Sequence, residues 1–208
     1  MRKSAKVKKA GGLESAAVKR NENIIRYADV TLLVVDATEP IGTQEKTLAG
    51  VLKDSGSGVI IIINKWDLIP DKTTTTMNRY REYISASLPF VEWAPVIFTS
   101  AVTSQRVKTI YDEIDTVQNN RERWLTEKEI DEFLRQAIAE HKPIKGIGTF
   151  APKVLGMKQV AIEPPTFDLI IKAKRTDMLS TGYVRFLINR MHKAFNLRGT
   201  PIRMNIRV

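Results

Sequence analysis

The sequence of 208 residues contains no cysteine, which excludes disulfides, thiol catalysis and cysteine-bound zinc or iron–sulfur clusters. It contains two histidines, His141 and His192, and their wide separation excludes a histidine-rich metal site. No run of about 18 apolar residues is present, and no apolar segment follows the basic residues at the start. We therefore expect a cytoplasmic protein with no metal cluster, no membrane span and no secretory signal.

Acidic residues are in deficit, and the imbalance is uneven along the chain. In total, 33 Lys and Arg stand against 23 Asp and Glu, a formal net charge of +10. Residues 1–20 carry +6 and residues 142–208 carry +10, whereas residues 21–141 carry −6. A basic segment is often only a solvated surface. Because summed phosphate contacts dominate nucleic-acid affinity, a long segment at +10 favours a polyanionic partner.

Short apolar runs alternate with helical patterns in the first part of the chain. The runs 29–36, 58–63 and 94–99 are rich in β-branched residues and show no polar alternation. Such runs are typical of strands that are buried on both faces of a parallel sheet. Apolar residues at helical spacing predict helices near 43–55, 75–88 and 104–122. The pattern predicts an α/β fold, a parallel sheet covered by helices.

A different pattern begins near Leu125. A capping box at residues 126–129 opens a helix, and residues 141–156 form a Gly/Pro-rich loop. Strands are expected at 157–163 and 166–173, on either side of Pro164 and Pro165, followed by a helix at 180–196 and a half-buried strand at 201–208. This order predicts a small α+β domain. We place the two domains at residues 1–122 and 123–208.

The tetrapeptide Asn64-Lys65-Trp66-Asp67 directly follows the second apolar run. Ligands of open α/β sheets bind beyond the carboxyl ends of the strands, so this is a suitable place for a site. The Asp67 carboxylate can accept hydrogen bonds from N1–H and N2–H₂ of guanine, an edge that adenine lacks. The Asn64 amide can bond N7 and tie neighbouring loops together, and the aliphatic stem of Lys65 can lie over the base. Taken alone, the tetrapeptide also fits an ordinary polar turn.

A second motif, Thr99-Ser100-Ala101, ends the next apolar run. The backbone N–H of Ala101 could donate to guanine O6, while the Ser100 hydroxyl could steady the loop that carries Asp67. A turn of small residues is the alternative for this motif alone. The order of the two motifs on consecutive strand ends predicts the base-recognising half of a guanine-nucleotide site, formed by Asn64, Lys65, Asp67, Ser100 and Ala101.

These motifs resemble the fourth and fifth G motifs of translation-factor-type P-loop GTPases. The segments 32–39 (LLVVDATE), 164–167 (PPTF) and 199–203 (GTPIR) are similar to the Der (EngA) family of ribosome-assembly GTPases. The resemblance implies a partial P-loop GTPase domain followed by a KH-like domain. It also implies GTP or GDP as the ligand, with Mg²⁺ only in a full-length parent, and a role in large-subunit assembly with the ribosome and ribosomal RNA as partners.

The phosphate-binding motifs of that family are missing from the sequence. There is no Gly-Lys dipeptide, hence no G-x-x-x-x-G-K-[ST] motif, and no Asp is followed three residues later by Gly. Residues 1–9 resemble the switch II region, so we expect an N-terminally truncated chain that lacks the phosphate-binding half. We predict no catalytic or metal-binding residues, no hydrolysis by this chain alone and GTP binding no tighter than roughly millimolar. A half sheet should also expose apolar strand edges.

The KH-like part is the second candidate site. No two glycines after residue 140 have Gly-x-x-Gly spacing, so the usual clamp on single-stranded RNA is not expected. Basic residues remain as candidate contacts to ribosomal RNA: Lys172, Lys174, Arg175, Arg185, Arg190, Lys193, Arg203 and Arg207. The alternative function is a non-catalytic RNA- or ribosome-binding adaptor that has lost GTPase activity. The paired motifs disfavour a nucleotide-binding protein of other chemistry.

Overall fold

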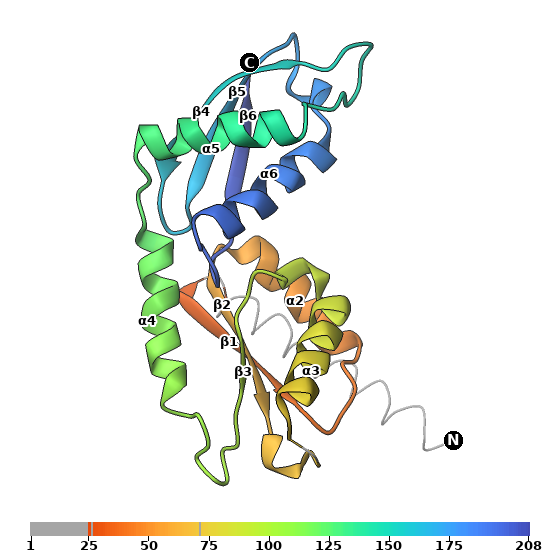
Figure 1. Ribbon diagram of the computed structural model, residues 1–208, viewed down its shortest axis with the longest axis vertical. Helices are drawn as coiled ribbons and strands as arrows, with labels where there is room; N and C mark the ends of the chain where they lie inside the picture. The colour runs from red at the N-terminus through yellow and green to blue at the C-terminus, as the bar shows by residue number, and fades with distance from the viewer. Residues whose placement is uncertain (1–24, 26, 71) are drawn as a thin grey trace, which may run out of the picture.

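A computed structural model describes residues 25, 27–70 and 72–208. The predicted switch II region at residues 1–9 lies outside the described residues. The described chain forms two units, each with its own three-stranded sheet and apolar core (Figure 1). The first unit contains β1 (Val30–Asp36), α2 (Thr43–Ser55), β2 (Gly58–Asn64), η1 (Trp66–Leu68), α3 (Thr74–Ser87), η2 (Pro89–Val91), β3 (Val96–Phe98) and α4 (Thr109–Glu122).

The sheet of the first unit is parallel, in the order β1-β2-β3. Residues of β2 are buried on both faces because helices cover both: α2 and α3 pack on the side of Ile61, and α4 packs on the side of Ile60 and Ile62. The unbroken apolar run 58–63 is the sequence signal of this arrangement. The predicted α/β fold with a parallel sheet is confirmed.

Strand β1 lies at the edge of the sheet as described. Leu33 and Val35 point into the core beneath α2, whereas Leu32 and Val34 are 37% and 59% exposed. In parallel sheets both faces are normally covered. On this face of β1 two apolar side chains are therefore exposed.

The second unit is an α+β layer pair, as predicted. It contains α5 (Glu127–Glu140), β4 (Lys153–Ala161), β5 (Thr166–Lys172), η3 (Thr176–Met178), α6 (Thr181–Ala194) and β6 (Arg203–Arg207). Strands β4 and β5 are antiparallel, and β6 joins β5 in parallel. The capping box is present, because the hydroxyl of Thr126 accepts from the N–H of Glu129, whose carboxylate accepts from the N–H of Thr126.

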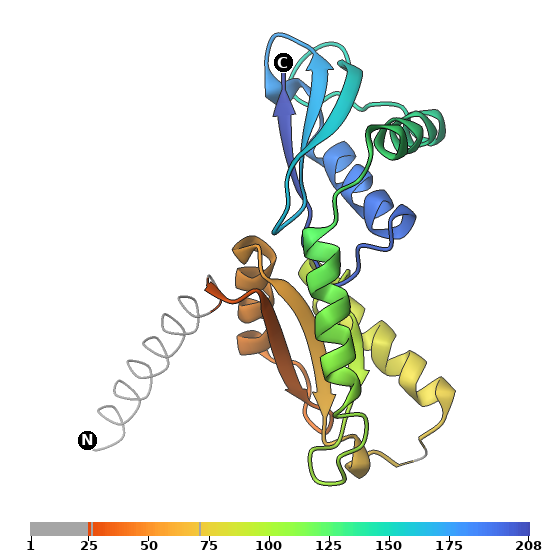
Figure 2. The ribbon, with the colours of Figure 1, turned by 90° about the vertical axis from the view of Figure 1, so that its left-hand side faces the viewer.

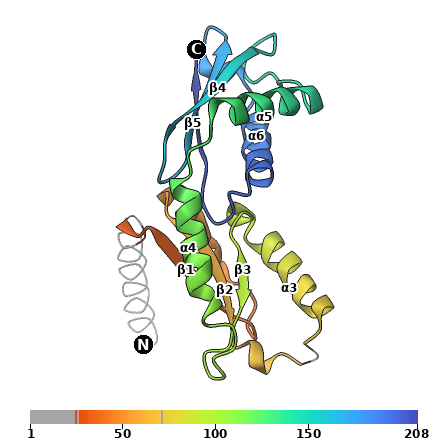
Figure 3. The ribbon, with the colours of Figure 1, turned by 60° about the vertical axis from the view of Figure 1, so that its left-hand side comes forward.

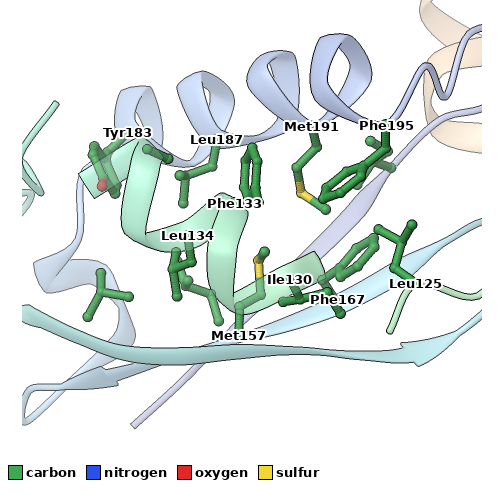
Figure 4. Close-up of a cluster of buried hydrophobic side chains, with 14 of the residues drawn as sticks. Leu125, Ile130, Phe133, Leu134, Met157, Phe167, Tyr183, Leu187, Met191 and Phe195 are labelled. Carbon is green, nitrogen blue, oxygen red and sulfur yellow. The ribbon is translucent and has the colours of Figure 1, made fainter. Parts of the chain in front are cut away.

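The two helices of the second unit cover one face of its sheet and leave the other open (Figure 2). Figure 4 shows the core between these layers, where Phe133 of α5 meets Phe195 at a centroid distance of 5.3 Å. Tyr183, Leu187 and Met191 of α6 are fully buried there. No helix among the residues described has the length and apolarity needed to cross a membrane.

Two elements begin four or five residues away from the predicted start. Strand β4 begins at Lys153 rather than at 157, because Val154 is buried in the core and a bulge beside Gly156 restores the register with β5. Helix α4 begins at Thr109 rather than at 104. The preceding turns contain Ser104 and Arg106 at positive φ, which a helix does not accommodate.

The loop that contains Gly199 joins the two units. Its N–H donates to Trp93 O over 2.9 Å, and its carbonyl accepts from the N–H of Val59 over 2.7 Å. Arg198 forms an ion pair with Glu113 of α4 at 3.0 Å. Gly199 has φ +78, and a Cβ atom here would lie 2.2 Å from a methyl group of Val117. The junction therefore requires glycine at this position.

Candidate functional site

The two predicted loops converge at the carboxyl ends of β2 and β3. The N–H of Thr99 donates to Ile63 O over 2.8 Å, and the N–H of Trp66 donates to Thr99 O over 2.9 Å. The N–H of Ala101 donates to Asn64 Oδ1 over 3.1 Å. Two hydrogen bonds therefore tie the Asn64–Asp67 loop to the Thr99–Ala101 loop, and a third ties the latter to the end of β2. The expected role of Asn64 in linking neighbouring loops is consistent with this geometry.

Trp66 anchors the Asn64–Asp67 loop. Its ring is 1% exposed and lies 4.4 Å from the Phe98 ring and 5.0 Å from the Tyr80 ring, measured between centroids. Lys65 has φ +60, which turns the chain sharply between β2 and η1. With the indole fixed in the core, the flanking Lys65 and Asp67 remain on the accessible side of the turn.

Asp67 has a carboxylate oxygen, Oδ1, that is shielded from solvent and has no hydrogen-bond partner among the described residues. The main-chain carbonyl of Asp67 accepts from Lys72 Nζ over 2.8 Å, which closes the loop behind it. A shielded acceptor without a donor carries a desolvation cost. The side chain of Asp67 as a whole is only half-buried, so the carboxylate lies beside the accessible edge of this loop.

Lys65 forms an ion pair with Asp36, the last residue of β1, over 2.5 Å. The N–H and hydroxyl of Thr38 donate to the same carboxylate over 2.9 and 2.7 Å. The hydrogen bond from Lys65, assisted by those from Thr38, lowers the pKa of Asp36 to about 2, and the same bond raises the pKa of Lys65. Sequence reasoning did not include Asp36 or Thr38 in the site, although an acid closing the strand was visible.

Ala101 and Ser100 make different contacts from those expected. The N–H of Ala101, assigned by sequence to guanine O6, donates to Asn64 Oδ1, so guanine O6 would compete with Asn64 for this donor. Ser100 is fully buried, and its hydroxyl accepts from the N–H of Thr103 over 3.1 Å. Ser100 thus stabilises its own turn. The Asp67 loop is held through the backbone of Thr99.

The phosphate side of a nucleotide has no counterpart in the described residues. They contain no group of three or more His, Cys, Asp or Glu that could hold a metal ion. The sequence has no Gly-Lys dipeptide with which to build a phosphate loop. Polar groups suited to a purine base therefore lie at this edge of the sheet, and the described residues include no such metal-binding group.

The candidate RNA contacts are divided among three places on the second unit. The open face of the sheet carries Lys172, Arg203 and Arg207, since their neighbours Ile171, Met204 and Ile206 point into the core. Helix α6, which packs on the other face, carries Arg185, Arg190 and Lys193. Lys174 and Arg175 lie in the loop between β5 and α6. The structure brings these residues into one unit but does not gather them in one patch.

Some of these cations are engaged by acidic residues. Arg190 pairs with Glu140 at 2.6 Å, and Arg175 pairs with Asp177. Arg207 pairs at 3.0 Å with Asp168, which is 7% exposed and also accepts from Asn205 over 2.9 Å. The hydrogen bond from Asn205, followed by that from Arg207, lowers the pKa of Asp168. Arg207 is therefore held in place on the open sheet face.

Two protein families match this chain. Residues 125–207 match the family described as KH-domain-like of EngA bacterial GTPase enzymes, C-terminal. Residues 18–120 match the elongation factor Tu GTP-binding domain. The junction between the two matches falls at the end of α4 and the start of α5.

Curated relatives match the chain over nearly its whole length. GTPase Der of Gloeobacter violaceus is 39% identical over 196 residues, which are 94% of this chain and 42% of that protein. GTPase Der of Thermosynechococcus vestitus is 34% identical over 195 residues, with coverage of 94% and 43%. The chain thus spans less than half the length of these relatives. Among solved structures, Era in complex with MgGDPNP and 16S ribosomal RNA nucleotides aligns with 91% of this chain and 68% of its own, at 16% identity and a TM-score of 0.40.

Proposed function

This chain belongs to the family of the GTPase Der (EngA) and corresponds to its C-terminal part, and on that premise we propose that it supplies guanine recognition and ribosomal RNA contact to a Der-type ribosome-assembly factor in the cytoplasm. Residues 1–122 form the partial GTPase domain and residues 123–208 the KH-like domain. GTP or GDP is the ligand of the first domain. The large ribosomal subunit is the partner of the second.

The place of Asp67, in a fixed loop at the carboxyl ends of β2 and β3, is the observation that carries the proposal. This loop is fixed by the buried Trp66 and by hydrogen bonds to the Thr99–Ala101 loop. Guanine offers two N–H donors to this carboxylate, and adenine offers none at the same edge. Leaving a buried donor or acceptor unpaired costs about 1–3 kcal/mol, so Asp67 would discriminate guanine from adenine.

The affinity of these 208 residues for GTP or GDP should be low. Phosphoryl transfer and most of the nucleotide's binding energy depend on a phosphate cradle and Mg²⁺. Neither has matching residues in this chain. We expect a dissociation constant of roughly 1 mM or weaker, about 4 kcal/mol, and no hydrolysis.

Nuclear magnetic resonance titration of the 208-residue chain with GDP, ADP and xanthosine diphosphate tests base recognition. Shifts of the residue 99–101 amides should saturate with GDP at roughly millimolar concentration and should not appear with ADP. Asp67→Asn should weaken GDP binding and favour xanthosine diphosphate, whose C2 oxygen accepts from the new amide. Asp54→Asn, on the exposed end of α2, is the matched control. Equal binding of ADP and GDP, or micromolar GDP affinity, would refute this interpretation.

A second candidate function is a non-catalytic RNA- or ribosome-binding adaptor. It is favoured by the basic second unit together with the missing phosphate motifs. Filter binding of a ribosomal RNA fragment over a series of salt concentrations tests RNA contact in either case, because each phosphate contact contributes about −0.7 to −0.9 to the log–log slope. Arg203→Ala should make the slope shallower, and the control Lys46→Ala on α2 should not. A response that does not change with salt would exclude phosphate contact.

A further inference from the structure

Two loops lie together at the end of the second unit that points away from the first unit (Figures 1 and 3). Residues 141–152 connect α5 to β4, and residues 173–180 connect β5 to α6. The N–H of Gly146 donates to Met178 O over 2.7 Å, and the N–H of Ile147 donates to Asp177 O over 2.9 Å. In the other direction, the N–H of Ser180 donates to Ile144 O over 2.9 Å. A Cβ atom on Gly146 would lie 2.4 Å from a backbone oxygen, so this close pairing requires glycine. The two loops are therefore fixed against each other.

Apolar side chains project from the first of these loops. Phe150 is 77% exposed, Ile147 is 67% exposed and Ile144 is 44% exposed. They lie beside a unit whose core is otherwise well packed. A backbone held in place that presents several large apolar side chains to solvent marks an interaction surface.

Basic residues flank these apolar side chains in the two loops and at the adjoining strand ends. The surface combines Phe150 and Ile147 with Lys142, Lys145, Lys153, Lys172, Lys174 and Arg175, and we refer to it as the basic–aromatic tip. Lys153 and Lys172 are partners in the β4–β5 register, which brings their side chains to the same face. Asp177 is the only acidic residue in segments 141–153 and 172–180, and it pairs with Arg175. The tip is therefore strongly positive.

We propose that the basic–aromatic tip binds single-stranded RNA, with an unpaired base stacked on Phe150 and adjoining phosphates on the surrounding lysines. Aromatic side chains set among cations are the recurring platform for unpaired nucleotides. Base faces inside a duplex are covered by their neighbours, so a duplex could use the cations but not the ring. This inference rests on the proposed ribosomal RNA contact and specifies the form of RNA and the residues. Phe150, Lys142, Lys145 and Lys153 were outside the set predicted from sequence.

A membrane surface is the other partner class that an apolar, basic loop could suit. The tip fits it less well, because Lys145 separates Ile144 from Ile147 and the cations continue along the paired strand ends at Lys153 and Lys172. A line of charges matches a chain of phosphates better than a plane of headgroups. Binding to vesicles is therefore treated as an outcome of the test.

Fluorescence anisotropy with the full 208-residue chain tests the proposal, using a labelled 12-nucleotide single-stranded RNA and a 12-base-pair RNA duplex as probes. Phe150→Ala should weaken single-strand binding about 5- to 100-fold and leave duplex binding unchanged. Phe150→Leu should behave like Phe150→Ala, whereas Phe150→Trp should retain single-strand binding. Lys145→Ala should weaken both probes. Tyr111→Ala, an exposed aromatic of α4 in an acidic surrounding, is the matched control and should change neither.

Two results would overturn the proposal. One is single-strand binding by Phe150→Ala equal to that of the unchanged chain. The other is a loss in Phe150→Ala, restored by Phe150→Leu, that appears with vesicles of mixed neutral and anionic phospholipid and not with RNA. Failure of the stacking proposal remains distinguishable from failure of ribosomal RNA contact, because salt-dependent duplex binding would persist in the first case and vanish in the second.

Discussion

Replacing Gly199 with alanine tests how the two units are joined. The residue has φ +78, and an added Cβ would lie 2.2 Å from a methyl group of Val117, which is fully buried. A left-handed backbone costs an alanine about 1–2 kcal/mol, and overpacking a core position costs about 1–3 kcal/mol more. We therefore expect Gly199→Ala to lower the free energy of unfolding by about 2–5 kcal/mol. Displacement of the loop should also weaken the hydrogen bonds to Trp93 and Val59.

Gly50→Ala is the matched control for this substitution. Gly50 lies inside α2, and nothing approaches within 4 Å of the position that its Cβ would take. Alanine is favoured over glycine in a helix by about 0.8–1 kcal/mol, so this variant should be more stable than the unchanged chain. Urea unfolding, monitored by circular dichroism, measures the free energy of unfolding of both variants. Equal stability of the Gly199→Ala variant and the unchanged chain would refute the packing described at the junction.

Three further predictions concern the site and the tip. Trp66→Ala should lower the free energy of unfolding by about 3–5 kcal/mol, since a buried ring is removed. Trp124→Ala, at a position 59% exposed, should change it by at most about 0.5 kcal/mol. Urea denaturation compares the two variants, and similar losses of stability would contradict the anchoring role of Trp66. Lys65→Ala should raise the pKa of Asp36 above its value of about 2. The ion pair stabilises the fold above about pH 3.8, the ordinary pKa of that carboxyl group, and its contribution is lost as the pH falls through about 2; a carboxyl-carbon titration that does not move in Lys65→Ala would disprove the pairing. Gly146→Ala should accelerate hydrogen exchange at the amides that join the two loops of the tip, and unchanged exchange would show that their pairing tolerates a side chain.

Apolar periodicity was sufficient to predict the order and type of the regular elements. The unbroken run 58–63 is typical of a strand with both faces covered, and β2 is such a strand. Alternation at 201–208 likewise predicted a half-buried strand, and β6 has one open face. The start of β4 was missed because glycine and proline upstream predict a loop, whereas the buried Val154 and a bulge extend the sheet through this stretch. Tertiary packing decided that boundary.

The convergence of the two motifs was predictable because parallel strands place their carboxyl ends at one edge. The partners of individual side chains were not. Lys65 pairs with Asp36 and Asn64 accepts from Ala101, and these contacts depend on rotamers and on loop shape. No regular spacing in the sequence indicates that Lys65 would contact Asp36 or that Asn64 would contact Ala101. The role of Asp67 in base recognition stays a prediction.

The charge of the second unit could also be read from the sequence, but its distribution could not. Which basic residues share a surface depends on the face of the sheet that α5 and α6 cover. Phe150 escaped sequence reasoning because an aromatic residue in a Gly/Pro-rich loop carries no periodic signal. Its exposure becomes visible only when hydrogen bonds fix the loop beside its neighbour.

The hydrogen bond from the N–H of Val59 to the carbonyl of Gly199 makes the Val59 amide sensitive to opening of the junction between the two units. Val59 is the second residue of the buried strand β2, and its N–H donates across the junction over 2.7 Å. Solvent can reach this proton only when the junction opens, so its hydrogen-exchange rate measures how often the two units part. Amides in the middle of the same strand exchange only when the sheet itself opens. Comparing the two rates within one strand would separate movement between the units from unfolding of the first unit, without any added label.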